Sequence, residues 1–449
     1  MSASARDVAV RTLGRVERSG AYSQLALAAE AQRARLDASA RGFATELVYG
    51  TLAWRGRLDA ALARFARKPL AALEPHALDA MRVAAYQLLF LDDVEDGMAV
   101  SAAVSQVRAS SGAALGRVAN AVLRALGRAR DGGALQFEGA GPEAELSAPS
   151  WLWDRWRARW GEARARAELA SAVERPPLHV RANTLRAAPA EVAEELRTAG
   201  AEVAPLRAPE GLRVRALPAP FVQPSFTAGR WTVQDEAAQL VSRLLAPPPG
   251  AVVLDACAGV GGKALHLAAL LDGSGTLFAA DIAANKLEVL AREATRLGAA
   301  GVRTAVADLA VTPAADHPAL AGARFDAVLV DAPCTGLGTI RRHPEVKWRR
   351  TPEDVARAPA LQSVLLASAA TAVRPGGALV YAVCSPEPEE GAEVVARFLS
   401  AHAGWRRAHA RTVPGVDWDG LCDDDGALTT SLATHGCDAF YAARLVRGP

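Results

Sequence analysis

The chain has 449 residues, of which 51% are hydrophobic and 22% are charged, and its formal net charge is only +2. This length predicts two to four domains, and the small net charge excludes nucleic-acid binding through overall charge alone. Five cysteines without paired spacing predict reduced thiols, a cytoplasmic protein and no metal site. The charged N-terminus has no apolar signal core, and no apolar run reaches the roughly 18 residues of a membrane helix, so no membrane partner is expected.

Residues 1–135 are predicted to form an all-helical domain. Apolar residues recur on one face of the first helix: Val8, Val10, Leu13 and Val16. The same spacing returns in three later segments: 43–54, 78–91 and 99–107. No segment here alternates apolar and polar residues as a half-buried strand does. The run Asp131-Gly132-Gly133 ends the helical pattern.

Residues 136–230 are predicted to form a helical linker and a small α+β module. Its expected elements are a strand, a helix and a strand: 179–183, 189–199 and 211–217. Trp153, Trp156 and Trp160 recur at helical spacing, which favours a packed core stripe. Arginines lie between these tryptophans, so base stacking with cationic support is the alternative.

Residues 231–449 are predicted to form the catalytic domain. Pro247-Pro248-Pro249-Gly250 ends a helix at 235–245, and short β-rich runs then alternate with helical segments. The expected strands are 252–255, 275–281, 302–308, 325–331 and 378–384. This alternation predicts a parallel, doubly wound, Rossmann-like α/β sheet. The expected fold class is therefore multi-domain, with an all-α, an α+β and an α/β part.

The predicted strands end in a series of aspartates: Asp255, Asp281, Asp308 and Asp331. Open α/β sheets bind ligands at the carboxyl ends of their strands. One such aspartate often only caps the next helix, but four in succession favour a ligand site. A glycine turn spans 257–263, and Asp281 follows Gly262 by nineteen residues. That is the spacing of a carboxylate that binds ribose hydroxyls, so an adenosine-containing cofactor is predicted.

Two cysteines stand fifty positions apart at the ends of apolar runs, Cys334 after Asp331-Ala332-Pro333 and Cys384 before Ser385-Pro386. Thiols at neighbouring strand ends, beside a nucleotide-type cofactor, indicate covalent chemistry on an electrophilic ring.

These motifs resemble those of the RNA cytosine-C5 methyltransferases. The resemblance rests on five stretches: Asp255 to Lys263, Asp331 to Gly338, Arg341 to Pro344, Lys347-Trp348 and Cys384-Ser385. The helical N-terminal domain resembles the NusB-like domain of the bacterial 16S rRNA branch, the RsmB or Sun type. The similarity covers essentially the whole chain and is most specific in its catalytic half.

The resemblance implies S-adenosylmethionine as the methyl donor. The residues that would surround its methionine and ribose side are Cys257, Ala258, Gly259, Val260, Gly261, Gly262 and Lys263. Asp281 would bind the ribose hydroxyls and Asp308 the adenine. Asp331 would lie between the cofactor and the target base, where Lys263 would contact either Asp331 or the base. The alternatives are a structural turn carboxylate for Asp331 and a solvated helix residue for Lys263.

The chemistry explains why two thiols are needed. C5 of cytosine is too weak a nucleophile until a thiolate adds to C6. In this family the later cysteine attacks, so Cys384 is the expected nucleophile, and Cys334 would assist product release. DNA cytosine methyltransferases use a Pro-Cys like Pro333-Cys334 instead, so the reverse assignment stays open.

The resemblance implies RNA, in particular 16S rRNA, as the partner, bound by the helical domain at 1–135 and the module at 136–230. The lack of a heptad seam favours a monomer. Arg341 and Arg342 would hold RNA phosphates, unless they are a solvated loop pair. The chain departs from the family pattern at Gly259-Val260, where Ala-Pro is usual, and at Val383, where Thr is usual. These changes leave open a non-catalytic RNA-binding or ribosome-assembly factor on a methyltransferase scaffold. A Rossmann oxidoreductase would explain the glycine turn but not the thiols.

Overall fold

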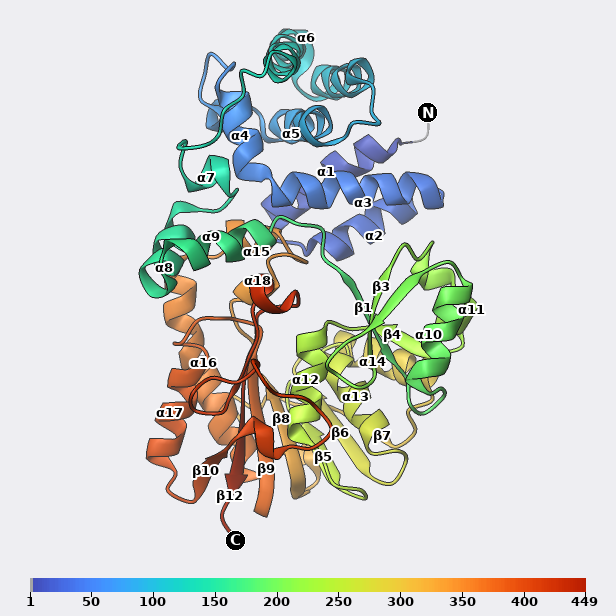
Figure 1. Cartoon of the computed structure of the whole chain (residues 1–449), viewed down its shortest axis with the longest axis vertical. Helices are drawn as coiled ribbons and strands as arrows, with labels where there is room; N and C mark the ends of the chain where they lie inside the picture. The colour runs from blue at the N-terminus through green and yellow to red at the C-terminus, as the bar shows by residue number, and fades with distance from the viewer. Residues whose placement is uncertain (1–2) are drawn as a thin grey trace. The chain divides into compact units, whose positions relative to one another are not determined.

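The computed structural model describes residues 3–449 (Figure 1). They fall into two units: residues up to Arg175 together with Ile340–Arg349, and Pro176–Thr339 together with Arg350–Pro449. The boundaries 1–135, 136–230 and 231–449 remain predictions, because the second unit contains both the middle α+β module and the large sheet. Within residues 3–449 no helix is long and apolar enough to cross a membrane.

The first unit is all-helical, as the sequence predicts. Its helices are α1 (Ala5–Ser19), α2 (Ser23–Arg33), α3 (Ala38–Ala53), α4 (Arg55–Ala63), η1 (Leu70–Ala72), α5 (Pro75–Phe90), α6 (Asp96–Asp131), α7 (Pro142–Glu145), α8 (Ser150–Trp160), α9 (Glu162–Ser171) and α15 (Glu345–Arg349). Helix α1 begins with a capping box, in which Ser4 and Asp7 exchange side-chain and backbone hydrogen bonds. The predicted apolar face of α1 is fully buried in a single core formed with α2, α3, α5 and α6.

Helix α6 is much longer than the predicted segment 99–107. It contains a kink at Gly112, whose φ of 85° is not helical, and then continues to Asp131. Glycine tolerates this backbone conformation, so the chain bends there without strain. The glycine pair that follows ends the helix, as the sequence predicts.

The tryptophan stripe of α8 belongs to the packed interior. Trp153 is 8% exposed and Trp156 only 1% exposed, and the Trp156 ring lies 5.1 Å from the ring of Trp160. The core interpretation of this stripe is therefore confirmed for Trp153 and Trp156. Arg159 and Arg164 lie over the Trp160 ring, the least buried of the three.

The second unit opens with a four-stranded antiparallel sheet in the order β2-β3-β1-β4. Its strands are β1 (Leu178–Ala182), β2 (Glu202–Pro205), β3 (Gly211–Arg215) and β4 (Trp231–Val233). Helix α10 (Pro189–Thr198) packs on the sheet through Val192 and Leu196, and short η2 (Pro220–Val222) and α11 (Pro224–Thr227) precede β4. This is the predicted α+β module, with β2 and β4 added to the two expected strands.

The larger sheet has the order β10-β12-β9-β8-β5-β6-β7, with β11 paired to β12 (Figure 1). Its strands are β5 (Val252–Asp255), β6 (Thr276–Asp281), β7 (Val302–Val306), β8 (Phe325–Asp331), β9 (Val373–Val383), β10 (Trp405–Ala408), β11 (Leu428–Thr429) and β12 (Tyr441–Arg447). Strands β5 to β9 pair in parallel, as predicted, whereas β12 runs antiparallel to β9 and β10. The sequence did not indicate these antiparallel strands.

Helices cover both faces of this sheet. They are α12 (Glu236–Leu245), α13 (Gly262–Leu270), α14 (Ala284–Leu297), α16 (Pro352–Thr371) and α17 (Ala392–Ala401); short η3 (Pro318–Leu320), η4 (Leu337–Thr339), η5 (Ala410–Thr412) and α18 (Leu432–His435) lie in connections. Alternate residues of β8 belong to different cores: Ala327 and Leu329 pack with α12 and α13, whereas Val328 and Val330 pack with α16 and α17. Because successive side chains of a strand point to opposite faces, continuous apolar runs are what a two-sided core requires.

Candidate active site

The glycine turn connects the end of β5 to the start of α13. Gly259 and Gly261 have positive φ values of 55° and 96°. A Cβ added to Gly261 would lie 2.7 Å from Cγ of Leu290, whereas one added to Gly259 would meet no atom within 4 Å. The turn therefore packs closely against α14 on one side and presents bare backbone to open space on the other, which leaves room for a ligand.

Carboxylates surround this turn, as expected for the carboxyl edge of the sheet. Asp255, Asp281 and Asp331 are the last residues of β5, β6 and β8, whereas Asp308 lies two residues beyond the end of β7. Asp281 Oδ2 accepts a 2.9 Å hydrogen bond from the Gly259 N–H, so it ties the turn to the next strand.

Asp255 is the most buried of these groups. Burial, followed by the nearby charge of Asp331, raises the pKa of Asp255 to about 7. Asp308 is half-buried, and its Oδ1 accepts a 3.0 Å hydrogen bond from the Ala310 N–H. A carboxylate that also caps its own loop is already oriented before a ligand binds.

Lys263, at the start of α13, lies against the end of β8. Its Nζ is 2.7 Å from Asp331 Oδ2 and 4.9 Å from the ring centroid of Phe440. Burial alone would lower the pKa of Lys263, but the charge and hydrogen bond of Asp331, followed by the Cys384 sulfur, outweigh burial and raise it. The ammonium therefore remains charged at the carboxyl edge of the sheet, next to the Cys384 sulfur.

The two predicted thiols are neighbours. The Sγ atoms of Cys334 and Cys384 are 3.3 Å apart, the first in the loop after β8 and the second directly after β9. Their loops are also joined through backbone, since the Gly338 N–H donates to the Cys384 carbonyl at 3.0 Å. The hydrogen bond with Cys384 and burial raise the pKa of Cys334 well above its usual range. Cys334 therefore keeps its proton at neutral pH.

Cys257 has a different environment. Burial raises the pKa of its thiol, and its backbone N–H donates to Asp255 Oδ1 at 3.3 Å. Ala258, Gly259 and Gly262 follow in the same turn. The side chain of Val260 is 55% exposed, so the residue that stands where proline is usual packs against little of the protein.

The middle module also reaches the glycine turn. Arg181 of β1 is 2% exposed, and its guanidinium donates to the Gly262 carbonyl at 2.9 Å and to the side chain of Gln234. Burial lowers the pKa of Arg181 to about 9. Local sequence patterns could not predict this contact, because 81 positions separate Arg181 from Gly262.

The two arginines predicted to bind RNA fall in a different unit from the other predicted site residues. Arg341 and Arg342 belong to the first unit, whereas the thiols and the glycine turn belong to the second. The Arg341 side chain is only 11% exposed, and its guanidinium donates to Glu174 Oε2 at 3.0 Å and to the Arg175 carbonyl at 3.2 Å. These contacts favour a structural role for Arg341; RNA binding by the pair remains a prediction.

Several residues near the thiols and the glycine turn were not predicted from the sequence. Ile282, directly after Asp281, is 66% exposed, an unusual position for an isoleucine and one that could have been noticed from its place after a strand-end aspartate. Phe440 lies under the Lys263 ammonium. Glu390, which is fully buried behind both thiols, was also overlooked.

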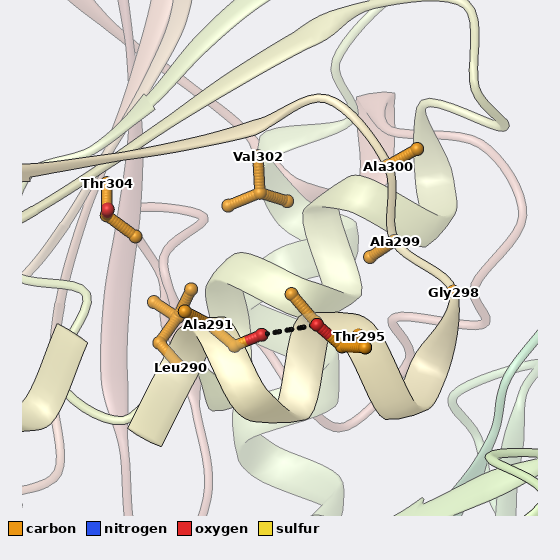
Figure 2. A pocket seen from close by; sticks show the side chains of 9 residues that line it. Leu290, Ala291, Thr295, Gly298, Ala299, Ala300, Val302 and Thr304 are labelled. Atoms are coloured by element: carbon orange, nitrogen blue, oxygen red, sulfur yellow. Dashed lines mark hydrogen bonds between the residues drawn. The ribbon is translucent and has the colours of Figure 1, made fainter. Parts of the chain in front are cut away.

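A separate hollow lies between α14 and β7 (Figure 2). Its lining is mostly small and apolar, and the Thr295 hydroxyl within it donates to the Ala291 carbonyl at 3.0 Å. None of the predicted cofactor or catalytic residues lines it. Among residues 3–449 no group of three or more His, Cys, Asp or Glu is arranged to hold a metal ion.

Comparison with known proteins places this arrangement in a family. The profile of the 16S rRNA methyltransferase RsmB/F family matches residues 242–446. The NusB family profile matches residues 3–128, and that of the ferredoxin-like domain of RsmF/B-like methyltransferases matches residues 148–218.

Individual relatives align along nearly the whole chain. A probable ribosomal RNA small subunit methyltransferase B of Synechocystis sp. is 32% identical over 98% of this chain and 99% of its own length. Its counterpart in Bacillus subtilis is 32% identical over 89% of each chain. The crystal structure of PH0851 superposes with a TM-score of 0.81 at 27% identity, covering 99% of both chains.

The fold and these matches define a class, the RNA methyltransferases that use S-adenosylmethionine. Within it, the chain belongs to the RsmB family of ribosomal RNA small-subunit methyltransferases. The site fits this cofactor: Gly259 exposes bare backbone, Asp281 and Asp308 offer acceptors for hydroxyl and amine groups, and Ile282 offers an apolar surface.

Proposed function

We propose that this enzyme methylates C5 of a cytosine in 16S rRNA through a covalent bond between Cys384 and C6 of the base. The observation that carries the proposal is the 3.3 Å separation of the Cys334 and Cys384 sulfurs beside the Lys263–Asp331 ion pair. A cysteine pair alone could be structural. A pair at the carboxyl edge of a cofactor-binding sheet, next to a buried ammonium, is suited to nucleophilic catalysis.

The pKa values favour one order of roles. Cys334 keeps its proton because its pKa is raised, so its S–H can donate toward Cys384. The Lys263 ammonium, whose pKa is raised in part by the Cys384 sulfur, favours a thiolate at Cys384. Cys384 is therefore the nucleophile that adds to C6. After methyl transfer, C5 loses its proton to a base, the C6–sulfur bond breaks and Cys384 leaves as the thiolate, a breakdown that Cys334 assists.

Bound S-adenosylmethionine supplies an electrophilic methyl group on a sulfonium. The turn Cys257 to Lys263 would hold this cofactor, with Asp281 accepting from its ribose hydroxyls and Asp308 from its adenine amine. Asp331, which pairs with Lys263, accepts a hydrogen bond from the exocyclic amine of the base, or from N3 once N3 carries a proton. That proton and the Lys263 ammonium offset the negative charge that develops on the ring as the thiolate adds. The target base must leave its stack to reach this edge, so a looped or single-stranded site is the expected substrate.

Two cysteine variants test the assignment on unmodified 16S rRNA. Cys384→Ala abolishes transfer of tritiated methyl groups and forms no covalent complex. Cys334→Ala still attacks but releases product slowly, so a denaturant-stable protein–RNA complex accumulates on gels. A stable complex with Cys384→Ala instead would reverse the two roles.

Bisulfite mapping of rRNA from cells with and without the gene identifies the modified base. The alternative function is a non-catalytic RNA-binding or assembly factor, and the changes from the family pattern at Gly259-Val260 and Val383 are what motivate it. If the wild-type protein binds the cofactor and RNA but incorporates no methyl groups, that alternative is correct.

A further inference from the structure

A single buried carboxylate lies behind both cysteines. Glu390 is 0% exposed and sits in the connection between β9 and α17. Its own backbone is fixed, because the hydroxyl of Tyr381 in β9 donates to the Glu390 carbonyl at 2.5 Å. Buried carboxylates are rare in proteins, and their hydrogen-bond partners show what they are for.

The partners of Glu390 are the residues that directly follow each cysteine. Oε1 accepts from the Thr335 N–H at 2.8 Å, and Oε2 accepts from the Thr335 hydroxyl at 2.5 Å. Oε2 also accepts from the Ser385 hydroxyl. Thr335 follows Cys334, and Ser385 follows Cys384, so one side chain fastens both catalytic loops.

A fourth donor completes the arrangement. The side-chain amide of Gln362 in α16 donates to Glu390 Oε1 at 3.1 Å and to the Pro333 carbonyl at 3.0 Å. Each carboxylate oxygen of Glu390 thus accepts two hydrogen bonds, which is the pattern that an ionised carboxylate satisfies. Thr335, Ser385 and Gln362 are all at most 2% exposed, so water does not compete for these bonds.

We propose that Glu390 is a positioning residue for the methyl transfer, which holds the Cys334 and Cys384 loops at the separation that the two-thiol chemistry requires. The inference rests on the proposed roles of the two cysteines. Glu390 does not touch substrate in this role; it acts through Thr335 and Ser385. Its charge is also among the causes, after the Cys384 hydrogen bond and burial, that raise the pKa of Cys334.

Glu390→Gln keeps the shape of the side chain but removes its negative charge and one of its two acceptor oxygens. The turnover number falls by about 100-fold, because misplacing reacting groups by about 1 Å costs this much, while KM for RNA changes little. Glu393→Gln is the matched control, since Glu393 is exposed on α17 and pairs with Arg397. It retains wild-type turnover. Ser385→Ala, which removes one of the four bonds, has a smaller effect, and Ser385→Thr restores it.

A second readout does not depend on methylation. In a Cys384→Ala background, iodoacetamide alkylation of Cys334 is followed across pH by mass spectrometry. The groups that face Cys334 are Glu390, Asp331 and Tyr381. Adding Glu390→Gln lowers the pH midpoint of alkylation, whereas adding Glu393→Gln does not. A merely loosened loop would raise the rate at every pH and leave the midpoint in place.

The outcomes separate the two proposals. Unchanged turnover and an unchanged alkylation midpoint in folded Glu390→Gln would refute the positioning role. A lowered midpoint, with no methyl transfer by the wild-type enzyme, would refute the proposed function and still support the placement of Glu390 behind Cys334. Should Glu390→Gln fail to fold, Ser385→Ala decides, because full turnover in that variant would contradict the proposal.

Discussion

Each unit of the molecule contains one deeply buried lysine, and the two have opposite electrostatic environments. Lys263 in the second unit lies 2.7 Å from the Asp331 carboxylate, and its pKa is raised despite burial. Lys347 in the first unit donates to the Ala53 carbonyl at 2.9 Å, and burial lowers its pKa to about 7. An opposite charge compensates for lost hydration, whereas a backbone dipole does so only in part.

The contrast separates a chemical role from a structural one. In the proposed mechanism, Lys263 is kept charged at an edge where a thiolate and a developing negative charge need stabilising. Lys347 joins α15 to the end of α3 with its side chain fully buried, so its charge is a cost. Both lysines lie in motifs that resemble the same family, so the motif alone could not distinguish their roles.

Removing the Lys263 charge is expected to have the largest effect. Lys263→Met leaves Asp331 without its cation and beside Asp255, and it removes the positive charge near Cys384. Turnover falls by about 100- to 1000-fold, the usual cost of losing one electrostatic stabiliser. The measurement is tritiated-methyl incorporation, with Lys68→Met at an exposed position as the control. Activity within about threefold of wild type would show that the ion pair is only structural.

Removing the Asp331 carboxylate instead should lower the pKa of Lys263, as burial lowers that of Lys347. The Asp331 carboxylate raises the pKa of Lys263, and burial lowers it. In Asp331→Asn the effect of burial dominates, so the pKa of Lys263 falls. The measurement is the pH dependence of reductive methylation at Lys263, resolved by mass spectrometry. The lysine becomes reactive at lower pH than in the wild-type protein, while Lys68 is unaffected. An unmoved profile at Lys263 would mean that a group other than Asp331 keeps it charged.

The sequence was sufficient for the parallel part of the large sheet. Strands β5 and β8 have the predicted bounds, because a strand buried on both faces reads as a continuous apolar run between turn residues. Strands β10 and β12 were missed. They are antiparallel and lie at one side of the sheet, where their polar residues, such as Arg406 and Arg444, interrupt the apolar pattern.

Long-range contacts account for the rest of what the sequence could not predict. Lys347 meets Ala53 across 294 positions, and Glu390 meets Thr335 across 55. Nothing in the local pattern around either residue indicates its partner. The cysteine and aspartate positions were recognisable because the turn chemistry that places them is local in sequence.

The buried charge of Lys347 should appear as a pH dependence of stability. Its pKa is about 7 in the folded chain and 10.5 when exposed. Between these values the unfolded chain binds more protons, so this group makes the protein more stable as pH rises from 7 to 10.5. Lys347→Met removes the effect, and the stability difference between wild type and variant changes by about 3 kcal/mol between pH 7 and 9.5.

Guanidinium unfolding of the full chain at both pH values measures this difference. The increase in stability with pH comes from Lys347, so Lys68→Met should keep the pH dependence of the wild-type stability. A Lys347→Met protein whose stability changes with pH as much as that of the wild type would show that the lysine is hydrated in the folded state.

The smallest expected effect is that of Trp348, the neighbour of Lys347. Its indole N–H donates to the Leu52 carbonyl at 2.9 Å, and the Arg55 guanidinium lies 5.3 Å from its ring centroid. Trp348→Phe keeps an aromatic ring but leaves the carbonyl without this donor, which costs about 1 kcal/mol. Arg55→Met in both backgrounds separates the ring–cation contact from the hydrogen bond. These contacts of Trp348 are with residues of the helical unit, so methyl transfer at 25 °C remains at the wild-type rate. A large loss of turnover in the stable Trp348→Phe protein would contradict the division between the two units.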